Sequence, residues 1–139
     1  MMVRRLLSLA AGAWLALAAP WAQAQDAPAE SPIGTWINPR GTVRVKTGLC
    51  GANLCGWVVW ASPQALEDAR SSGVNSLIGT ELLRNYRAAG IREWHGQVYV
   101  PDMGETFYSR IVQLAPNSLK ISGCILGGLI CKSQVWQKG

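Results

Sequence analysis

Four cysteines are the residues of this chain best suited to form covalent bonds, and they occur as two close pairs. Cys50 and Cys55 are separated by four residues, and Cys124 and Cys131 by six. Each spacing suits two strands that face each other across a tight, glycine-containing turn. Four cysteines allow three pairings. The spacing favours the two local disulfides, with a cross-link between the two turns as the next arrangement.

The same cysteines could instead bind zinc or exchange disulfides, but their spacing argues against both. Structural zinc sites and thioredoxin-type redox pairs use cysteines separated by two residues, and neither pair has that spacing. The chain is also expected to be exported, for reasons given below, and thiols oxidise in such compartments. We therefore expect disulfides, no metal site and no cofactor.

General acid–base chemistry would centre on His95, the single histidine of the chain. On a strand, His95 shares a face with Glu93, so a carboxylate–imidazole pair can form. Catalysis would also need a positioned nucleophile or, for a metal, three ligands. Asp102 and Glu105 flank Gly104 in a turn, where an aspartate bonds its own backbone. No glycine-rich phosphate loop joins a strand to a helix, so we expect no catalytic residues and no enzyme.

Aromatic residues could form a binding site for an apolar molecule. Many of these rings are expected simply to fill a small core, but some could line a cavity in which a few polar groups orient a ligand. Trp57 and Trp60 are three positions apart, so on a regular strand they point to opposite faces. Arg110 could pair with an acid head group near the mouth. The candidate ligand-binding residues are Trp60, Trp94, Tyr99, Tyr108 and Arg110.

The N-terminus has the pattern of a secretory signal peptide. Arg4 and Arg5 precede an apolar run over residues 6–19, and Ala22-Gln23-Ala24 is an A-x-A cleavage site. The run is too short to cross a bilayer, which takes about 20 helical residues. We expect cleavage after Ala24 and a periplasmic or secreted protein without a stable membrane anchor.

One domain follows this segment. Removing residues 1–24 from the 139-residue chain leaves 115 residues, the length of a single domain. Residues 25–32 are expected to form a flexible leader, and residues 33–139 the domain. The formal charge of +5 falls to +3 when Arg4 and Arg5 are removed. The remaining cations are scattered rather than clustered, so nucleic acid is not an expected partner.

Short apolar stretches from residue 33 onward are separated by turn residues at a spacing typical of all-β domains. Within Val43-Arg44-Val45-Lys46, apolar and charged side chains alternate as in a half-buried strand. Residues 62–76 interrupt the pattern, and Ser62 followed by Pro63 predicts a short helix or an ordered loop. The expected strands cover residues 33–37, 42–47, 55–61, 81–87, 92–100, 105–114, 118–125 and 131–138.

Eight antiparallel strands in sequence order leave two exposed edges unless their sheet closes on itself. We therefore expect a single antiparallel up-and-down β-barrel of eight strands. A barrel of this size either fills with its own side chains or holds one small ligand.

Several short motifs occur in an order that resembles a known bacterial family. Gly34-x-Trp36 is similar to the lipocalin and calycin signature. Later motifs resemble the bacterial domain-of-unknown-function family 2147, and the resemblance covers about residues 33–138. These motifs are Leu54-Cys55-Gly56, Val58-Val59-Trp60, Leu77-x-Gly79, Trp94-x-Gly96, Val98-Tyr99-x-Pro101, Gly104-x-Thr106-x-Tyr108, Leu119-Lys120-x-x-Gly123-Cys124 and Gln134-x-Trp136.

The resemblance implies an exported, lipocalin-like barrel without an assigned enzymatic activity. It also implies that Trp36 packs across the closed end of the barrel against a basic residue near the end of the last strand. Lys138 has that position, where family members tend to have an arginine whose planar guanidinium stacks on indole. Structural roles are therefore expected for Gly34, Trp36, Trp136 and Lys138.

The favoured function is the binding of a small apolar or amphipathic molecule, of the fatty acid or isoprenoid type, by an exported barrel. The alternative is a protein–protein interaction module of the cell envelope, with a filled barrel and no small ligand. The sequence does not identify a protein partner. A lysozyme is disfavoured, because lysozymes are commonly basic and would be repelled by a positively charged chain.

Overall fold

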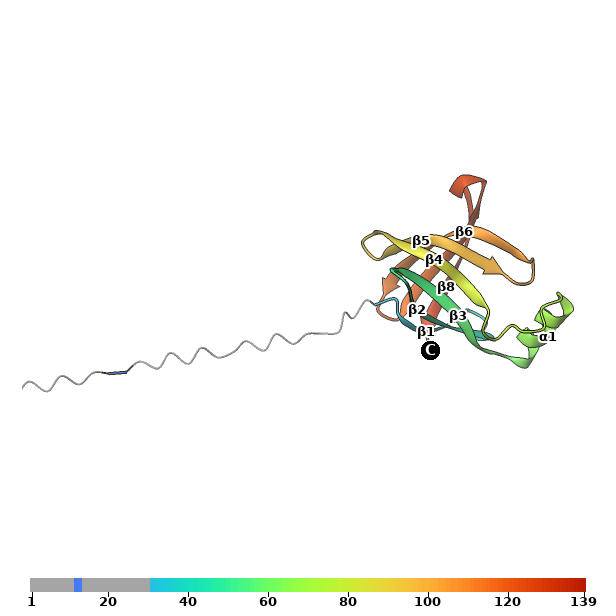
Figure 1. Cartoon of the computed structure of the whole chain (residues 1–139), viewed down its shortest axis with the longest axis horizontal. Coiled ribbons are helices and arrows are strands. Elements are labelled where there is room, and N and C mark those ends of the chain that lie inside the picture. The colour runs from blue at the N-terminus through green and yellow to red at the C-terminus, as the bar shows by residue number, and fades with distance from the viewer. Residues whose placement is uncertain (1–11, 14–30) are drawn as a thin grey trace, which may run out of the picture.

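A computed structural model describes residues 12–13 and 31–139 of the chain. In that part, eight strands form a closed barrel in which each strand is antiparallel to the next and β8 pairs with β1. The architecture confirms the expected all-β, up-and-down barrel (Figure 1). The strands are β1 (Gly34–Ile37), β2 (Val43–Cys50), β3 (Asn53–Ala61), β4 (Glu81–Gly90), β5 (Glu93–Val100), β6 (Glu105–Ala115), β7 (Ser118–Ile125) and β8 (Ile130–Lys138).

A short helix, α1 (Pro63–Ser71), lies between β3 and β4, within the interval where the sequence predicts a helix or an ordered loop. Ser62 caps it, since its Oγ accepts a hydrogen bond of 3.1 Å from the N–H of Ala65. Pro63 starts the helix at a position where a missing N–H costs nothing. A 3-10 turn, η1 (Leu126–Gly128), joins β7 to β8.

The two ends of the barrel carry different connections. The β1–β2, β5–β6 and β7–β8 turns and the segment with α1 lie at one end, which we call the open end. The β2–β3, β4–β5 and β6–β7 turns lie at the other, the closed end, where the chain enters β1. Figure 1 shows α1 and the β5–β6 turn on one side of the barrel and the β4–β5 turn on the other.

Both local disulfides are present, which confirms the favoured pairing of the cysteines. Cys50–Cys55 joins β2 to β3 at the closed end, and Cys124–Cys131 joins β7 to β8 at the open end. Each end of the barrel therefore has one covalent link between neighbouring strands.

Large side chains fill the middle of the barrel and its closed end. Trp36, Leu83, Tyr86, Ile111 and Leu119 are all 0% exposed. The Tyr86 hydroxyl lies 2.7 Å from Oγ of Ser109, which is also buried. A buried phenol without such a partner would lower stability, so this hydrogen bond allows a tyrosine to be buried in the core.

Two glycines make room for these side chains. A Cβ atom at Gly96 would lie 2.7 Å from the carbonyl oxygen of Arg84 and 2.7 Å from Cγ of Tyr86. A Cβ atom at Gly56 would lie 2.8 Å from Cδ1 of Leu83. Non-bonded atoms in a packed interior do not approach so closely. The closed end therefore has no space for a side chain at either position.

Trp36 closes the barrel at this end. Its indole Nε1 donates a hydrogen bond of 3.0 Å to the carbonyl oxygen of Pro32, and Oγ1 of Thr47 donates to the same oxygen. Lys138 is the register partner of Trp36, and its Nζ lies 5.7 Å from the centre of the indole ring. The contact implied by the family resemblance is therefore present. Ser31 also accepts a hydrogen bond from β6, so the last two residues of the expected leader contact the barrel.

The expectation that Trp57 and Trp60 point to opposite faces is wrong. Trp57 pairs with Lys46 and Trp60 with Arg44, and both partners lie on the outer face. The β2–β3 register shifts between Arg44 and Val45. This bulge places an extra residue between the two tryptophans, so both turn outward.

The expected signal peptide, residues 1–24, lies outside the described residues except for positions 12 and 13. Within the described ranges, no helix combines the length and the apolar character needed to cross a bilayer.

Candidate functional site

The open end of the barrel contains a cavity of about 500 Å³. This volume is in the range of small-molecule sites, roughly 300–1,000 Å³. Strands β5 to β8 form its wall, and the β5–β6 turn together with the facing ends of β7 and β8 forms its rim. Most of the lining is apolar. It consists of Val98, Tyr99, Val100, Pro101, Met103, Phe107, Ile121, Gly123, Ile125, Ile130, Lys132, Gln134 and Trp136.

Strands β7 and β8 show how the barrel changes from hollow to filled. Their inward residues pair in four layers from rim to floor, which are Ile125 with Ile130, Gly123 with Lys132, Ile121 with Gln134, and Leu119 with Trp136. At the rim, Ile125 and Ile130 are 47% and 54% exposed, whereas at the floor Leu119 and Trp136 are 0% and 7% exposed. The exposed rim and buried floor show that the cavity opens outward and ends at Trp136.

Gly123 leaves space in the second layer. A Cβ atom at this position would lie 3.4 Å from Cγ1 of Val98 on β5, an ordinary van der Waals distance. The backbone of Gly123 is not left-handed, so other residues can adopt it. A larger side chain at Gly123 would project into the cavity, which makes this glycine different from the crowded Gly96.

In the described part of the chain, two polar side chains face the cavity, and both lie on β8. Oε1 of Gln134 accepts a hydrogen bond of 2.9 Å from the indole Nε1 of Trp136. Because indole can only donate, this bond fixes which end of the amide carries the NH₂ group. Lys132 carries the one formal charge in the lining, and no ion pair involves it among the described residues. The Lys132 ammonium and the Gln134 NH₂ group therefore offer a ligand mainly hydrogen-bond donors.

A second hollow of about 490 Å³ adjoins the cavity beside α1. It contains charges of both signs, because Arg40, Asp68 and Asp102 all contribute to its lining. The mouth of the barrel thus has an apolar side along β5 to β8 and a polar side along α1. The wall shared by the two hollows consists of Val100, Pro101, Gln134 and Trp136.

The ligand-binding residues that the sequence predicts lie in different parts of the barrel. Tyr99 borders the cavity, and its ring lies 4.5 Å from the guanidinium carbon of Arg84. Trp94 pairs with the buried Ile111 and packs against the core near the closed end. Trp94 does not line the cavity, and Tyr99 only borders it, because alternation on β5 turns Val98 inward and the ring of Tyr99 outward toward Arg84.

Trp60, Tyr108 and Arg110 lie on the outer face and do not line the cavity. Along β6, alternation turns Ser109 inward, so its two neighbours point outward. The guanidinium carbon of Arg44 lies 5.3 Å from the ring of Trp60, on the outward side that the β2–β3 bulge gives this tryptophan. Arg110 thus points away from the cavity in which it was expected to meet an acid head group.

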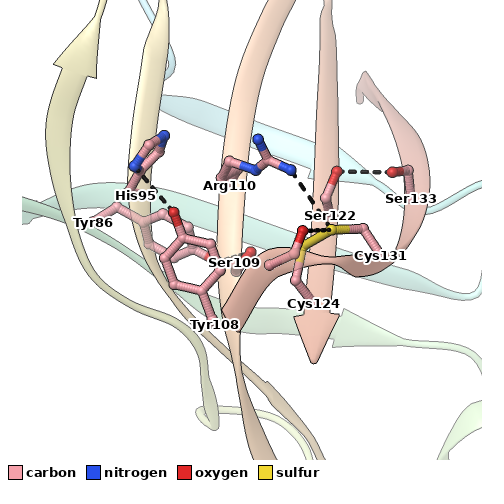
Figure 2. Close-up of a disulfide and its surroundings, with 10 residues drawn as sticks. Tyr86, His95, Tyr108, Ser109, Arg110, Ser122, Cys124, Cys131 and Ser133 are labelled. Carbon is pink, nitrogen blue, oxygen red and sulfur yellow. Dashed lines mark hydrogen bonds between the residues drawn. A yellow bond between two sulfur atoms is a disulfide. The ribbon is translucent and has the colours of Figure 1, made fainter. Parts of the chain in front are cut away.

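Glu93, His95 and Tyr108 form a chain of hydrogen bonds on the outer face. Nε2 of His95 lies 3.0 Å from Oε1 of Glu93, and Nδ1 lies 3.1 Å from the Tyr108 hydroxyl. Figure 2 shows His95 and Tyr108 beside Arg110, whose Nη2 donates to Sγ of Cys131 at 3.6 Å. The carboxylate–imidazole pair is therefore present. All three groups are at least one-third exposed, and neither hollow described above includes them.

The sequence prediction missed most of the apolar lining and both polar residues of the site, Lys132 and Gln134. A signal for them exists in β8, where Ile130, Lys132, Gln134 and Trp136 alternate along one face. A buried Trp136 implies that the other three residues also face inward. Lysine and glutamine normally indicate a solvated face. A face that points into the barrel and is also solvated indicates an open cavity.

Comparisons with known proteins support the family and the fold. The profile of a family described as "Uncharacterized protein conserved in bacteria (DUF2147)" matches residues 34–138. Among solved structures, protein HP1028 from Helicobacter pylori, described as belonging to the lipocalin family, is similar with a TM-score of 0.61 and 14% sequence identity. The match covers 78% of this chain and 83% of that chain. No curated protein sequence matches the chain.

Proposed function

The chain belongs to the bacterial DUF2147 family, and from this premise we propose that it is an exported barrel that binds a small apolar or amphipathic molecule. The observation that carries the proposal is the apolar cavity of about 500 Å³ at the open end of a barrel whose other end is filled. The likeness to a lipocalin-family protein supports the architecture that such binding requires.

Burial of apolar surface supplies the affinity in this proposal. Each Å² of apolar surface removed from water contributes about 25 cal/mol, and the cavity offers the side chains of Val98, Phe107 and Ile121 as partners. The buried Trp136 gives the ligand a closed floor. The exposed rim gives it an entrance, so the barrel need not unfold to be loaded.

A filled barrel that acts only as a protein–protein interaction module is the competing hypothesis. Complete filling predicts no cavity, and the hollow between β5 and β8 weighs against it. A catalytic role has little support, because the Glu93–His95–Tyr108 chain is exposed and lies outside both hollows.

Export is part of the proposal. Two disulfides are compatible with an oxidising compartment, and the residues before position 25 have the signal-peptide pattern. In the bacterial envelope, an apolar molecule outside the inner membrane would need a protein to shield it from water, which is the role proposed for the barrel.

Titration of delipidated protein with a hydrophobic, environment-sensitive dye tests the function. The wild type is expected to give a saturable response, and mass spectrometry of lipid extracted from the purified protein is expected to show a co-purifying molecule. Gly123→Leu fills the cavity and should weaken dye binding by about tenfold or more, the effect of losing ~1.4 kcal/mol of binding free energy.

Gly48→Leu is the matched control. Gly48 lies on β2, and a Cβ there would meet only the ring of Trp57 at 3.5 Å, on the outer face. This variant should bind the dye like the wild type. A flat titration of folded wild-type protein with fatty acids, isoprenoids and dyes would reject the ligand-binding function in favour of the interaction module.

A further inference from the structure

We propose that Lys132 and Gln134 make the cavity selective for amphiphiles with an anionic carboxylate head group. This inference rests on the proposed function and names its ligand class. It assigns to Lys132, inside the barrel, the role that the sequence had suggested for Arg110 on the outer face.

The position of Lys132 allows it to reach a ligand. It is paired across β7–β8 with Gly123, which has no side chain, one layer below the rim isoleucines. The side chain of Lys132 is exposed although it points into the barrel, because the cavity is open. An empty site therefore leaves its ammonium group solvated.

Ligand binding changes the solvation of the Lys132 ammonium group. An apolar tail that fills the cavity displaces water, and a charge that loses water without gaining a partner is strongly destabilising. Among the described residues, no aspartate or glutamate lines the cavity, so its wall provides no counter-charge. An alcohol or a hydrocarbon would leave Lys132 uncompensated, whereas a carboxylate would pair with it.

Gln134 strengthens the same preference. Its Oε1 already accepts a hydrogen bond from the indole N–H of Trp136, whereas its NH₂ group has no acceptor among the described residues. The ammonium of Lys132 can also only donate. A carboxylate accepts hydrogen bonds without donating any, so it matches both groups at once.

The neighbouring hollow is a poorer site for such a head group. Arg40 contributes a positive charge to its lining, but Asp68 and Asp102 contribute two negative charges. An anion placed there would meet repulsion as well as attraction. The charge of Lys132, by contrast, is surrounded by apolar residues and Gln134.

Equilibrium binding of dodecanoic acid and 1-dodecanol, two ligands with equal chain lengths, tests the inference at neutral pH. The wild type should bind the acid roughly 10- to 100-fold more tightly, the range expected when a charge-assisted hydrogen bond is gained. Lys132→Met should lose this preference by weakening acid binding while alcohol binding stays the same or improves. Lys132→Arg should keep the preference, because it retains the charge.

Lys120→Met is the matched control, since Lys120 lies on β7 with its side chain exposed on the outer face. It should behave like the wild type. Equal binding of acid and alcohol by the wild type, or a preference that survives in Lys132→Met and disappears in Arg40→Met, would overturn the inference while the binding function stands. Failure of folded wild type to bind either ligand would refute the binding function itself.

Discussion

The two ends of this barrel are built from the same strands, but one interior is filled and the other is hollow. At the closed end, Trp36, Tyr86 and Leu119 fill the interior and are fully buried. At the open end, the inward side chains of β7 and β8 leave a cavity of about 500 Å³ and remain exposed to it. Empty volume lowers stability relative to a packed interior. The comparison therefore indicates that the closed end stabilises the fold, while the open end is available for a ligand.

Glycines show this difference most directly. Gly96 is enclosed by the backbone of β4 and the ring of Tyr86, whereas Gly123 has its nearest neighbour at 3.4 Å. The same residue type therefore permits tight packing at one end and preserves a hollow at the other. Substitutions at the two ends should separate stability from binding.

The largest loss of stability is expected from Trp36→Ala. It removes a fully buried indole together with its hydrogen bond to Pro32 and its contact with Lys138. Large-to-small changes of this kind lower the free energy of unfolding by about 3–5 kcal/mol. Chemical denaturation measures the effect. A variant that unfolds at nearly the same denaturant concentration as the wild type would show that Trp36 does not hold the closed end together.

A smaller and more selective effect is expected from the pair Gly96→Ala and Gly123→Ala. Gly96→Ala places a methyl group 2.7 Å from a backbone oxygen and should lower the free energy of unfolding by about 1–3 kcal/mol, as overpacking does. Gly123→Ala meets only ordinary contacts and should change stability by at most ~0.5 kcal/mol. Comparable destabilisation of both variants, measured by urea unfolding, would contradict the division into a filled and a hollow end.

An effect similar in size to that of Gly96→Ala, but dependent on pH, is expected from Tyr86→Phe. Burial raises the pKa of the Tyr86 phenol well above its ordinary value, and the hydrogen bond to Ser109 offsets part of that rise. In the unfolded chain the phenol ionises near pH 10, so above this pH the unfolded state gains stability that the folded state does not. Wild-type stability should therefore fall as the pH rises through this region.

Tyr86→Phe should lower stability at pH 7 by about 1–3 kcal/mol, because Ser109 loses its buried partner. Between pH 9 and 11 its stability should decline less steeply than that of the wild type, which thermal unfolding across this range can measure. Tyr108→Phe, which alters a phenol that is 42% exposed, is the control. An identical alkaline decline in wild type and Tyr86→Phe would argue against a neutral, buried Tyr86.

Much of the fold could be predicted from the sequence because its signals are local. Alternation and turn residues predicted all eight strands, with differences of up to three residues at their ends. Ser62 and Pro63 predicted the start of α1. Short loops between the cysteines favoured the two disulfides that are present. Each of these features depends on residues within about ten positions of one another, so one chain segment contains the evidence.

The binding site could be predicted only in part, because its members are brought together by the barrel. Tyr99 was predicted and borders the cavity, whereas Tyr108 and Arg110 were predicted and lie outside it. The inward or outward direction of a strand residue depends on register. The bulge in the β2–β3 pairing, which turns both Trp57 and Trp60 outward, has no clear local signature.

The sequence by itself determined the strands, their order, the short helix and the cysteine pairs, since each follows from near neighbours along the chain. Only the tertiary structure decided which end of the barrel is filled and which is hollow. That outcome depends on whether a side chain on one strand meets a large or a small residue on another, as Tyr86 meets Gly96 and Lys132 faces Gly123. Packing across the barrel therefore places Lys132, a residue type typical of protein surfaces, in the wall of the cavity.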